Sequence, residues 1–378
     1  MTMKPIKRNV LFNPGPATTT DSVKIAQVVP DICPREDEFT QVMMELCDKI
    51  LEVVHANKDE YASVLFCGSG TICMDACINS LLDDTGKILI LDNGAYSERA
   101  FDICCYYNLP CYHLSYLDNL PINTDEVGTF LDEHRDVKVV YVTHQETGTG
   151  LLNPIREIGE CAHKHNAVLV VDTTSTYAML PINVRDDNID FCMASAQKGI
   201  MGMTGLSFVI GKRNLIEESG KFPRRSYYCN LFRQYDYFEK TGQMHFTPPV
   251  QTVYAARQAL VEYFEEGEES KWFRHRSVYN ALCDGLARLG FKSYLKQKYE
   301  AGLVTTALYP DDSNWDFDFI HDYCYTRGYT IYPGKISNKE MFRLCALGAI
   351  TPKDVESFFV VFKKALIEAG VKVPVQYN

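Results

Sequence analysis

Four short runs of apolar residues constrain the fold of this 378-residue chain more than any other feature. They are almost continuously hydrophobic instead of alternating, which is typical of strands in a sheet that is covered on both faces. Between the second and third runs, Ile155, Ile158 and Ala162 recur at helical spacing, and Pro154 suits the first turn of a helix. Strand, helix and strand at this spacing predict a mostly parallel α/β sheet. The four runs are residues 87–91, 137–142, 167–171 and 206–210.

The pattern changes after about residue 213, and the second part of the chain predicts a smaller α+β domain. Its expected elements are a helix over 250–264, an acidic break at 265–269, a helix over 271–289, strands at 303–308 and 329–332, and a closing helix over 352–369. We therefore predict an N-terminal arm (1–20), a large domain (21–264) and a small C-terminal domain (265–378).

Composition argues against several classes of protein. The net charge of −11 comes without a basic stripe, so duplex nucleic acid is not an expected partner. No stretch approaches the roughly 20 apolar residues of a membrane span, and no secretory h-region follows the N-terminal Met. Many of the 14 cysteines sit in apolar runs, and no set with metal-ligand spacing occurs. We expect a soluble cytoplasmic protein without a structural metal.

The segment Cys67-Gly68-Ser69-Gly70-Thr71 follows an apolar run and precedes a helix pattern that begins at Ile72. Glycines let the backbone approach an anion, which the hydroxyl groups and the first helical N–H groups can then bind. The segment has neither the Walker spacing nor the full dinucleotide fingerprint. By itself it indicates either a phosphate-binding loop or a simple tight turn.

Two further features carry chemistry. Asp172 ends an apolar strand, where open α/β sheets bind ligands, although a helix-capping aspartate would look the same. Lys198 lies in Ala194-Ser195-Ala196-Gln197-Lys198-Gly199, a stretch of small residues without other charge. Desolvation there favours the neutral amine that attacks an aldehyde, and an exposed loop lysine is the alternative. Because all three features follow strands of one sheet, we expect them to meet in one crevice.

In this order the motifs resemble those of the class V aminotransferases, which are fold-type I enzymes with pyridoxal phosphate (PLP). The resemblance runs from Leu11 to about Ala369, and the branch that it resembles most acts on 2-aminoethylphosphonate. It implies an α/β fold whose large domain holds a mostly parallel seven-stranded sheet. The motifs that carry it are Asn13-Pro14-Gly15-Pro16-Ala17-Thr18-Thr19, Gly68-Ser69-Gly70-Thr71, Asn93-Gly94-Ala95-Tyr96, the run from His144 to Pro154, Val171-Asp172, Ser195-Ala196-Gln197-Lys198, Phe246-Thr247-Pro248-Pro249, Ile331-Tyr332-Pro333-Gly334-Lys335 and Phe342-Arg343.

The resemblance also implies roles for single residues. Lys198 would form the Schiff base with PLP and move the proton, while Asp172 would pair with the ring nitrogen. Tyr96 would stack on the ring, and Thr247 would reach the cofactor of a neighbouring subunit, which implies a homodimer with shared active sites. The other implied cofactor contacts are Ser69, Gly70, Thr71, Thr147 or Thr149, and Gln197.

Arg343 would bind the anionic group of the substrate, because its planar fork suits a carboxylate or phosphonate. Thr18 and Arg35 are further candidates for substrate contacts. For Arg35 the alternative is a surface arginine paired with Glu38, because such pairs are common and weak.

The implied reaction is a ping-pong transfer between 2-aminoethylphosphonate and pyruvate, both small molecules, and it yields phosphonoacetaldehyde and alanine. An alanine–glyoxylate or serine–pyruvate aminotransferase would share every cofactor residue. A cysteine desulfurase needs a reactive cysteine, and Cys345 lies in an apolar run that suits one poorly. A non-catalytic ligand-binding protein on the same fold is the alternative from another class.

Overall fold

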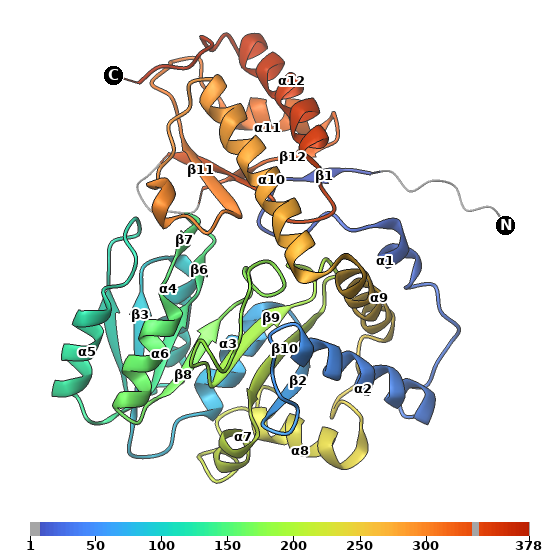
Figure 1. The fold of residues 1–378 in the computed structure, drawn as a ribbon, viewed down its shortest axis with the longest axis vertical. Coiled ribbons are helices and arrows are strands. Elements are labelled where there is room, and N and C mark those ends of the chain that lie inside the picture. Colours follow the sequence, from blue (N-terminus) through green and yellow to red (C-terminus); the bar gives the residue numbers. More distant parts are fainter. Residues whose placement is uncertain (1–7, 335–339, 378) are drawn as a thin grey trace.

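The computed structural model describes residues 8–334 and 340–377, and a seven-stranded sheet forms its centre (Figure 1). The strand order is β2-β10-β9-β8-β5-β3-β4, and only β10 (Leu206–Lys212) runs against the others. The remaining strands are β2 (Tyr61–Cys67), β3 (Lys87–Asp92), β4 (Cys111–Ser115), β5 (Val137–Thr143), β8 (Val168–Asp172) and β9 (Phe191–Ser195). The mostly parallel α/β sheet expected from the apolar runs is confirmed.

Both faces of this sheet are covered by helices, which explains why its central strands are mostly apolar. Leu89 of β3 packs into a cluster with Phe39 of α2 (Asp37–Glu52), on one face. Its neighbour Ile90 packs into a second cluster with Met74 of α3 (Gly70–Ser80), on the opposite face. Alternate residues of a strand point to opposite faces, so a strand buried on both sides needs apolar residues at every position.

The C-terminal part of the chain builds a separate core around a small sheet of β11 (Val304–Leu308), β14 (Met341–Cys345) and β13 (Tyr332–Pro333). The helices α10 (Glu268–Arg288), α11 (Phe317–Tyr325) and α12 (Pro352–Ala369) pack against it, and the chain reaches it through α9 (Val250–Glu266) and α10 (Figure 1). Phe342 of β14 and Phe362 of α12 are fully buried there.

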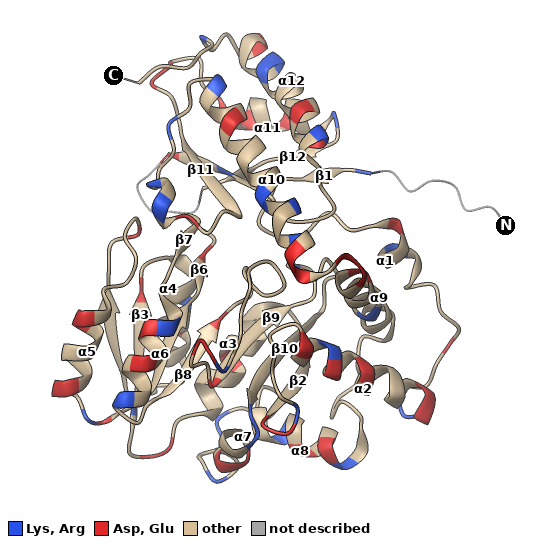
Figure 2. Ribbon diagram, viewed as in Figure 1, with Lys and Arg blue, Asp and Glu red and all other residues tan. Residues whose placement is uncertain are grey.

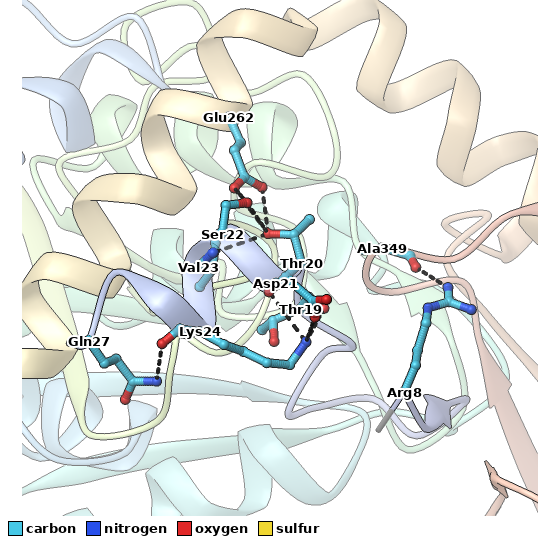
Figure 3. A network of polar contacts seen from close by, with 10 residues as sticks. All are labelled: Arg8, Thr19, Thr20, Asp21, Ser22, Val23, Lys24, Gln27, Glu262 and Ala349. Carbon is cyan, nitrogen blue, oxygen red and sulfur yellow. Dashed lines mark hydrogen bonds and ion pairs between the residues drawn. The ribbon is translucent and has the colours of Figure 1, made fainter. Parts of the chain in front are cut away.

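The opening segment of the chain joins this C-terminal core. Strand β1 (Val10–Leu11) pairs in parallel with β12 (Tyr329–Thr330), and Phe12 lies 4.7 Å from Phe358, centroid to centroid. Hydroxyl groups of Thr20 and Ser22 bind the Glu262 carboxylate of α9, as Figure 3 shows. These contacts tie the segment both to α9 and to the C-terminal core, so its Pro-Gly-Pro turn is held at a fixed place between them.

Two expectations for the second half of the chain are wrong in detail. The acidic break does not interrupt the helices over five residues, because α9 continues to Glu266 and α10 begins at Glu268. Only Gly267, with φ of +80°, separates them. The run 329–332 is not one strand, because it divides between β12, which pairs with β1, and β13, which pairs with β14. The other elements are α1 (Asp21–Ile25), α4 (Ala95–Tyr106), α5 (Thr124–Glu133), β6 (Gln145–Glu146), β7 (Leu151–Leu152), α6 (Ile155–Lys164), α7 (Arg213–Ser219), α8 (Leu231–Thr241) and the 3-10 turn Gln297–Tyr299.

Acidic and basic residues are interspersed along the outer helices (Figure 2). Among the residues described, no helix combines the length and the apolar character that crossing a membrane requires. All 14 cysteines are free thiols, and seven of them are buried.

Candidate active site

The carboxyl ends of the parallel strands bring the predicted chemical groups to one edge of the sheet. Asp172 ends β8, Ser195 ends β9, and the loop after β2 leads into α3. Since β2, β8 and β9 run in the same direction, these three ends face the same side. Ligands of open α/β sheets bind at this edge.

Lys198 lies in a tightly turned loop directly after β9. Its N–H donates to Ser195 O at 3.2 Å, and its own carbonyl accepts from Met201 N at 2.9 Å. The Nζ donates to Pro14 O in the opening segment. Gly15 has φ of +131°, and a Cβ there would stand 2.6 Å from Lys198 Cδ, so a larger residue at position 15 would collide with the lysine. The Pro-Gly-Pro turn therefore covers the side chain of Lys198.

A buried lysine that the sequence did not point to supports the same loop. Lys271, in the first turn of α10, is only 1% exposed, and its Nζ donates to Gly199 O at 2.7 Å. Burial lowers the pKa of this amine to about 7, helped by the positive charge of Arg274. Gly199 has no room for a side chain, because a Cβ would stand 1.9 Å from Tyr177 O. The Lys271 bond and the close approach of Gly199 to Tyr177 fix the backbone immediately after Lys198.

Asp172 is 3% exposed, and Thr174 N donates to its Oδ1 at 2.8 Å. Burial raises the pKa of this carboxyl, while the bonds from Thr174 and the charges of Lys198 and Arg99 act in the opposite direction. The positive charge of Lys198 thus acts on the Asp172 carboxylate. This juxtaposition is the one that the order of motifs along the chain predicted.

The first turn of α3 forms the wall beside these groups. Ser69 is the N-cap residue, and its side chain makes no capping bond. A Cβ on Gly70 would stand 3.2 Å from Thr174 Cγ2 and 3.6 Å from Ser195 Oγ, which places Gly70 against the ends of β8 and β9. The Thr71 hydroxyl accepts from Arg99 at 3.3 Å. The first N–H groups of a helix lack partners within the helix and bind anions readily.

Tyr96 and a buried glutamate meet at the start of α4. Glu146 Oε2 accepts from Tyr96 N at 3.2 Å, and Oε1 accepts from Ser97 N at 2.8 Å and from Ser97 Oγ at 2.7 Å. Glu146 is fully buried, and burial raises the pKa of its carboxyl to about 7. The sequence shows Glu146 next to Thr147, but nothing in the sequence indicates that it caps a helix about 50 residues away.

The titration of Glu146 predicts a pH effect that glutamine should remove. Because its folded-state pKa of about 7 exceeds the ordinary value of 4.5, its stabilising contribution is complete at low pH and is lost as the pH rises through about 7. The shift corresponds to about 3 kcal/mol. In protein freed of small ligands, Glu146→Gln should not lose this stability. The difference in the free energy of unfolding between the variant and wild type should therefore change by about the same amount between pH values below 4.5 and pH values above about 7. Denaturant titrations across this pH range measure it, and parallel pH profiles for both proteins would contradict it.

Arg343 lies on β14 and is 1% exposed. Its Nη1 donates to Thr147 O at 2.8 Å, while Nε and Nη2 donate to Pro333 O at 3.2 and 3.0 Å. The arginine thereby joins the C-terminal core to the loop that holds Thr147 and Thr149. The Thr149 carbonyl accepts from Thr306 of β11 at 2.6 Å, a second link between these parts. Lys335 of the Tyr-Pro-Gly-Lys motif lies outside the described residues.

The remaining candidates have other partners in this chain. The Thr18 hydroxyl accepts from Leu11 N at 2.9 Å. Arg35 donates to Met244 O at 2.7 Å, to His245 O at 3.3 Å and to Gln243 Oε1 at 3.3 Å, and these are the described hydrogen bonds of its side chain, in place of one to Glu38. Thr247 is exposed and follows that segment, so the structure brings Arg35 near Thr247 and does not bring either of them to Lys198 by a described contact. Gln197 adjoins the lysine, and its carbonyl accepts from Ala17 N at 2.8 Å.

Comparison with known proteins agrees with this architecture. Solved structures of similar fold include ureidoglycine–glyoxylate aminotransferase from Bacillus subtilis (TM-score 0.89, 19% identity, 98% of this chain and 95% of that one). Another is alanine–glyoxylate aminotransferase from Nostoc sp. (TM-score 0.87, 23% identity, 97% and 98%). At these identities the likeness establishes the fold alone, and it confirms the expected fold type.

Relatives found by sequence have higher identity to this chain than these solved structures. A 2-aminoethylphosphonate–pyruvate transaminase from Phocaeicola vulgatus is 33% identical over 94% of this chain and 98% of its own length. One from Vibrio vulnificus is 34% identical over 94% and 97%. A bifunctional phosphonoacetaldehyde hydrolase/aminoethylphosphonate transaminase from Clostridioides difficile is 33% identical, and the chain spans 56% of its length. The family model described as aminotransferase class-V matches residues 24–313. This chain belongs to the class-V aminotransferase family.

Proposed function

We propose that this protein is a PLP-dependent aminotransferase that exchanges an amino group between 2-aminoethylphosphonate and pyruvate, with phosphonoacetaldehyde and alanine as products. The observation that carries the proposal is the juxtaposition of Lys198, Asp172 and the first turn of α3 at one sheet edge. Relatives at 33–34% identity over nearly their whole length bear the name of this activity.

The described residues fit PLP. Ser195 Oγ, Gln145 Oε1 and Gln197 Oε1 are buried atoms without a hydrogen-bond partner among the described residues, although buried polar groups are nearly always paired. Gly70 leaves space beside Ser195 that a side chain would fill. The first turn of α3 would hold the cofactor phosphate through Ser69, Gly70 and Thr71. A polar ligand at this edge would satisfy atoms that the chain alone leaves unpaired.

When bound, PLP supplies an aldehyde that takes up the amino group and a ring that accepts electrons from the substrate carbon. Lys198 would hold the cofactor through Nζ and, once released by the incoming amine, would move the proton from the substrate carbon to the carbon that carried the cofactor's aldehyde. Asp172 would keep a proton on the ring nitrogen, since a carboxylate there stabilises the positive charge. Tyr96 would lie against the ring, and Thr147 or Thr149 would donate to its 3-oxygen.

Arg343 would bind the phosphonate of one substrate and the carboxylate of the other. A guanidinium has five N–H donors, and the carbonyls of Thr147 and Pro333 occupy three of them. The two that remain belong to Nη1 and Nη2, which can bind two oxygens of one anion. The three bonds to backbone also fix the side chain before substrate arrives, so little rotational freedom is lost on binding. We also infer that Thr18 and Arg35 contribute to substrate binding.

We further infer that the protein is a homodimer in which Thr247 reaches the partner's cofactor. We also infer that it is cytoplasmic. The exposure of Thr247, together with the Arg35 bonds that fix the segment preceding it, is compatible with a contact outside this chain. Fourteen free thiols suit a reducing compartment.

A cysteine desulfurase is disfavoured by the same structure. Cys345 is fully buried, and burial raises the pKa of its thiol to about 12, whereas a nucleophilic cysteine needs an accessible thiolate.

A half-reaction screen tests the substrate assignment. Purified protein loaded with PLP is mixed separately with 2-aminoethylphosphonate, alanine and serine, and the visible absorption band is followed without an acceptor. We expect the band to disappear fastest with 2-aminoethylphosphonate, more slowly with alanine and least with serine, because only the first two are amines of the proposed pair. A fast response to serine without one to 2-aminoethylphosphonate would overturn the substrate assignment and favour a serine–pyruvate type of enzyme.

A further inference from the structure

An arginine that none of the motifs includes stands at the first turn of α3. Arg99 lies on α4, its Nη1 donates to Thr71 Oγ1 at 3.3 Å, and its guanidinium carbon stands 5.0 Å from the centroid of the Tyr96 ring. It therefore touches two residues that the proposed function places at the cofactor, one at the helix end and one at the ring. Its charge also acts on Asp172.

Ser195 gives an independent sign that this helix end receives a ligand. The residue is 1% exposed, and its Oγ has no hydrogen-bond partner in the part of the chain that the structure describes. The same oxygen stands 3.6 Å from the position that a Cβ on Gly70 would take, so it points toward the first turn of α3. A buried hydroxyl aimed at a helix N-terminus indicates a ligand with acceptor oxygens.

Without Arg99, the surrounding groups supply too little positive charge for such a ligand. A phosphate monoester carries close to two negative charges at neutral pH. The helix end supplies the equivalent of about half a positive charge, and the Ser195 hydroxyl is neutral. Asp172 and Glu146 are acidic groups at this edge, and Lys198, the other cation whose charge acts on Asp172, is engaged with the cofactor aldehyde in the proposed function. Arg99 brings a full positive charge and a planar fork that matches phosphate oxygens, and its contact with Thr71 already directs it to the helix end.

We propose that Arg99 is a phosphate-binding residue of this site, where it binds the phosphate of PLP together with the first turn of α3 and Ser195. The proposal rests on the proposed function and extends it to a residue outside the family motifs. A phosphonate substrate offers the same chemistry, so the two possible sources of the anion have to be separated by experiment. We assign Arg99 to the cofactor, because it contacts Thr71 and Tyr96, whereas Arg343 binds the carbonyls of Thr147 and Pro333.

The test compares Arg99→Met, which keeps the length but removes the charge, with Arg99→Lys, which keeps the charge but loses the fork. Arg257→Met is the matched control, because Arg257 pairs with Glu45 of α2. Equilibrium dialysis and the visible band give the dissociation constant for PLP. We expect Arg99→Met to raise it about 10- to 100-fold, Arg99→Lys to raise it less, and Arg257→Met to leave it unchanged. Pyridoxal, which lacks the phosphate, should bind all four proteins alike.

Two further arms identify the anion and separate this inference from the proposed function. With PLP saturating, the KM for 2-aminoethylphosphonate should be the same in Arg99→Met and wild type. A raised KM with unchanged PLP binding would overturn the assignment in favour of the substrate anion, and equal PLP binding in all variants would overturn it outright. Stabilisation of the PLP-free protein by inorganic phosphate should weaken in Arg99→Met. If wild type formed no visible band, the proposed function would fail, while the phosphate arm would still decide the role of Arg99.

Discussion

Replacing Lys198 with alanine is expected to lower kcat by at least about 10³-fold, because one side chain both holds the cofactor and moves the proton. The protein should stay folded, since the Lys198 side chain has a single described hydrogen bond, to Pro14 O. The visible band of PLP bound to the protein should shift to that of the unattached cofactor. Stopped-flow absorbance with 2-aminoethylphosphonate measures both effects.

Two variants of other lysines test whether the loss of activity is specific to Lys198. Lys240→Ala removes an exposed lysine that pairs with Asp236 and should leave kcat unchanged. Lys271→Met removes the donor to Gly199 O, so it should disturb the loop and lower kcat less than Lys198→Ala does. If Lys198→Ala retained wild-type turnover and spectrum, the assignment of the lysine would be wrong.

Replacing Asp172 with asparagine is expected to lower kcat by about 10²- to 10³-fold, the range seen when one preorganised electrostatic contact is removed. Asparagine has the same shape and can still accept the bond from Thr174 N, but it carries no negative charge to hold a proton on the ring nitrogen. The PLP dissociation constant should change much less than kcat. Steady-state kinetics at saturating PLP, beside equilibrium dialysis, separate the two quantities.

Asp190 offers a matched control for Asp172. It is also a buried carboxylate at this sheet, but it pairs with Lys212 and His163 away from the lysine loop. Asp190→Asn should lower the free energy of unfolding and leave kcat near that of wild type. A kcat for Asp172→Asn within twofold of wild type would contradict the proposed role of Asp172.

The large sheet could be predicted because its buried strands are runs of consecutive apolar residues. A strand covered on both faces has to be apolar at every position, and residues 87–91 of β3 are almost entirely so. The closing helix, Pro352–Ala369, matched its predicted bounds, since Pro352 stands in its first turn and Gly370 ends it with a left-handed conformation. Local signals of this kind need no knowledge of distant contacts.

Details that depend on tertiary partners could not be predicted in the same way. The acidic run 265–269 predicts a break of five residues. In the structure α9 and α10 include all of this run except Gly267, which adopts a positive φ. The run 329–332 reads as one strand, and it divides because β1 and β14 each pair with a different half. The domain boundary near residue 265 stays a prediction.

In the candidate site, too, residues with local sequence signals could be predicted and residues that depend on tertiary contacts could not. Lys198, Asp172 and the loop before α3 could be identified because each follows a strand in the sequence, and their roles stay predictions until tested. Lys271, Glu146 and Arg99 could not be identified, because their partners Gly199, Tyr96 and Thr71 lie between 28 and 72 residues away along the chain. No local pattern distinguishes a buried lysine or glutamate from an exposed one before the fold is known.

Borohydride labelling tests the central claim most directly. The protein is loaded with PLP, treated with borohydride to reduce the C=N bond to a stable C–N bond, digested and analysed by mass spectrometry. The account predicts one modified residue, Lys198, and protection of that residue when excess 2-aminoethylphosphonate is added first. A label on another lysine such as Lys271, or no label with PLP in excess, would contradict it.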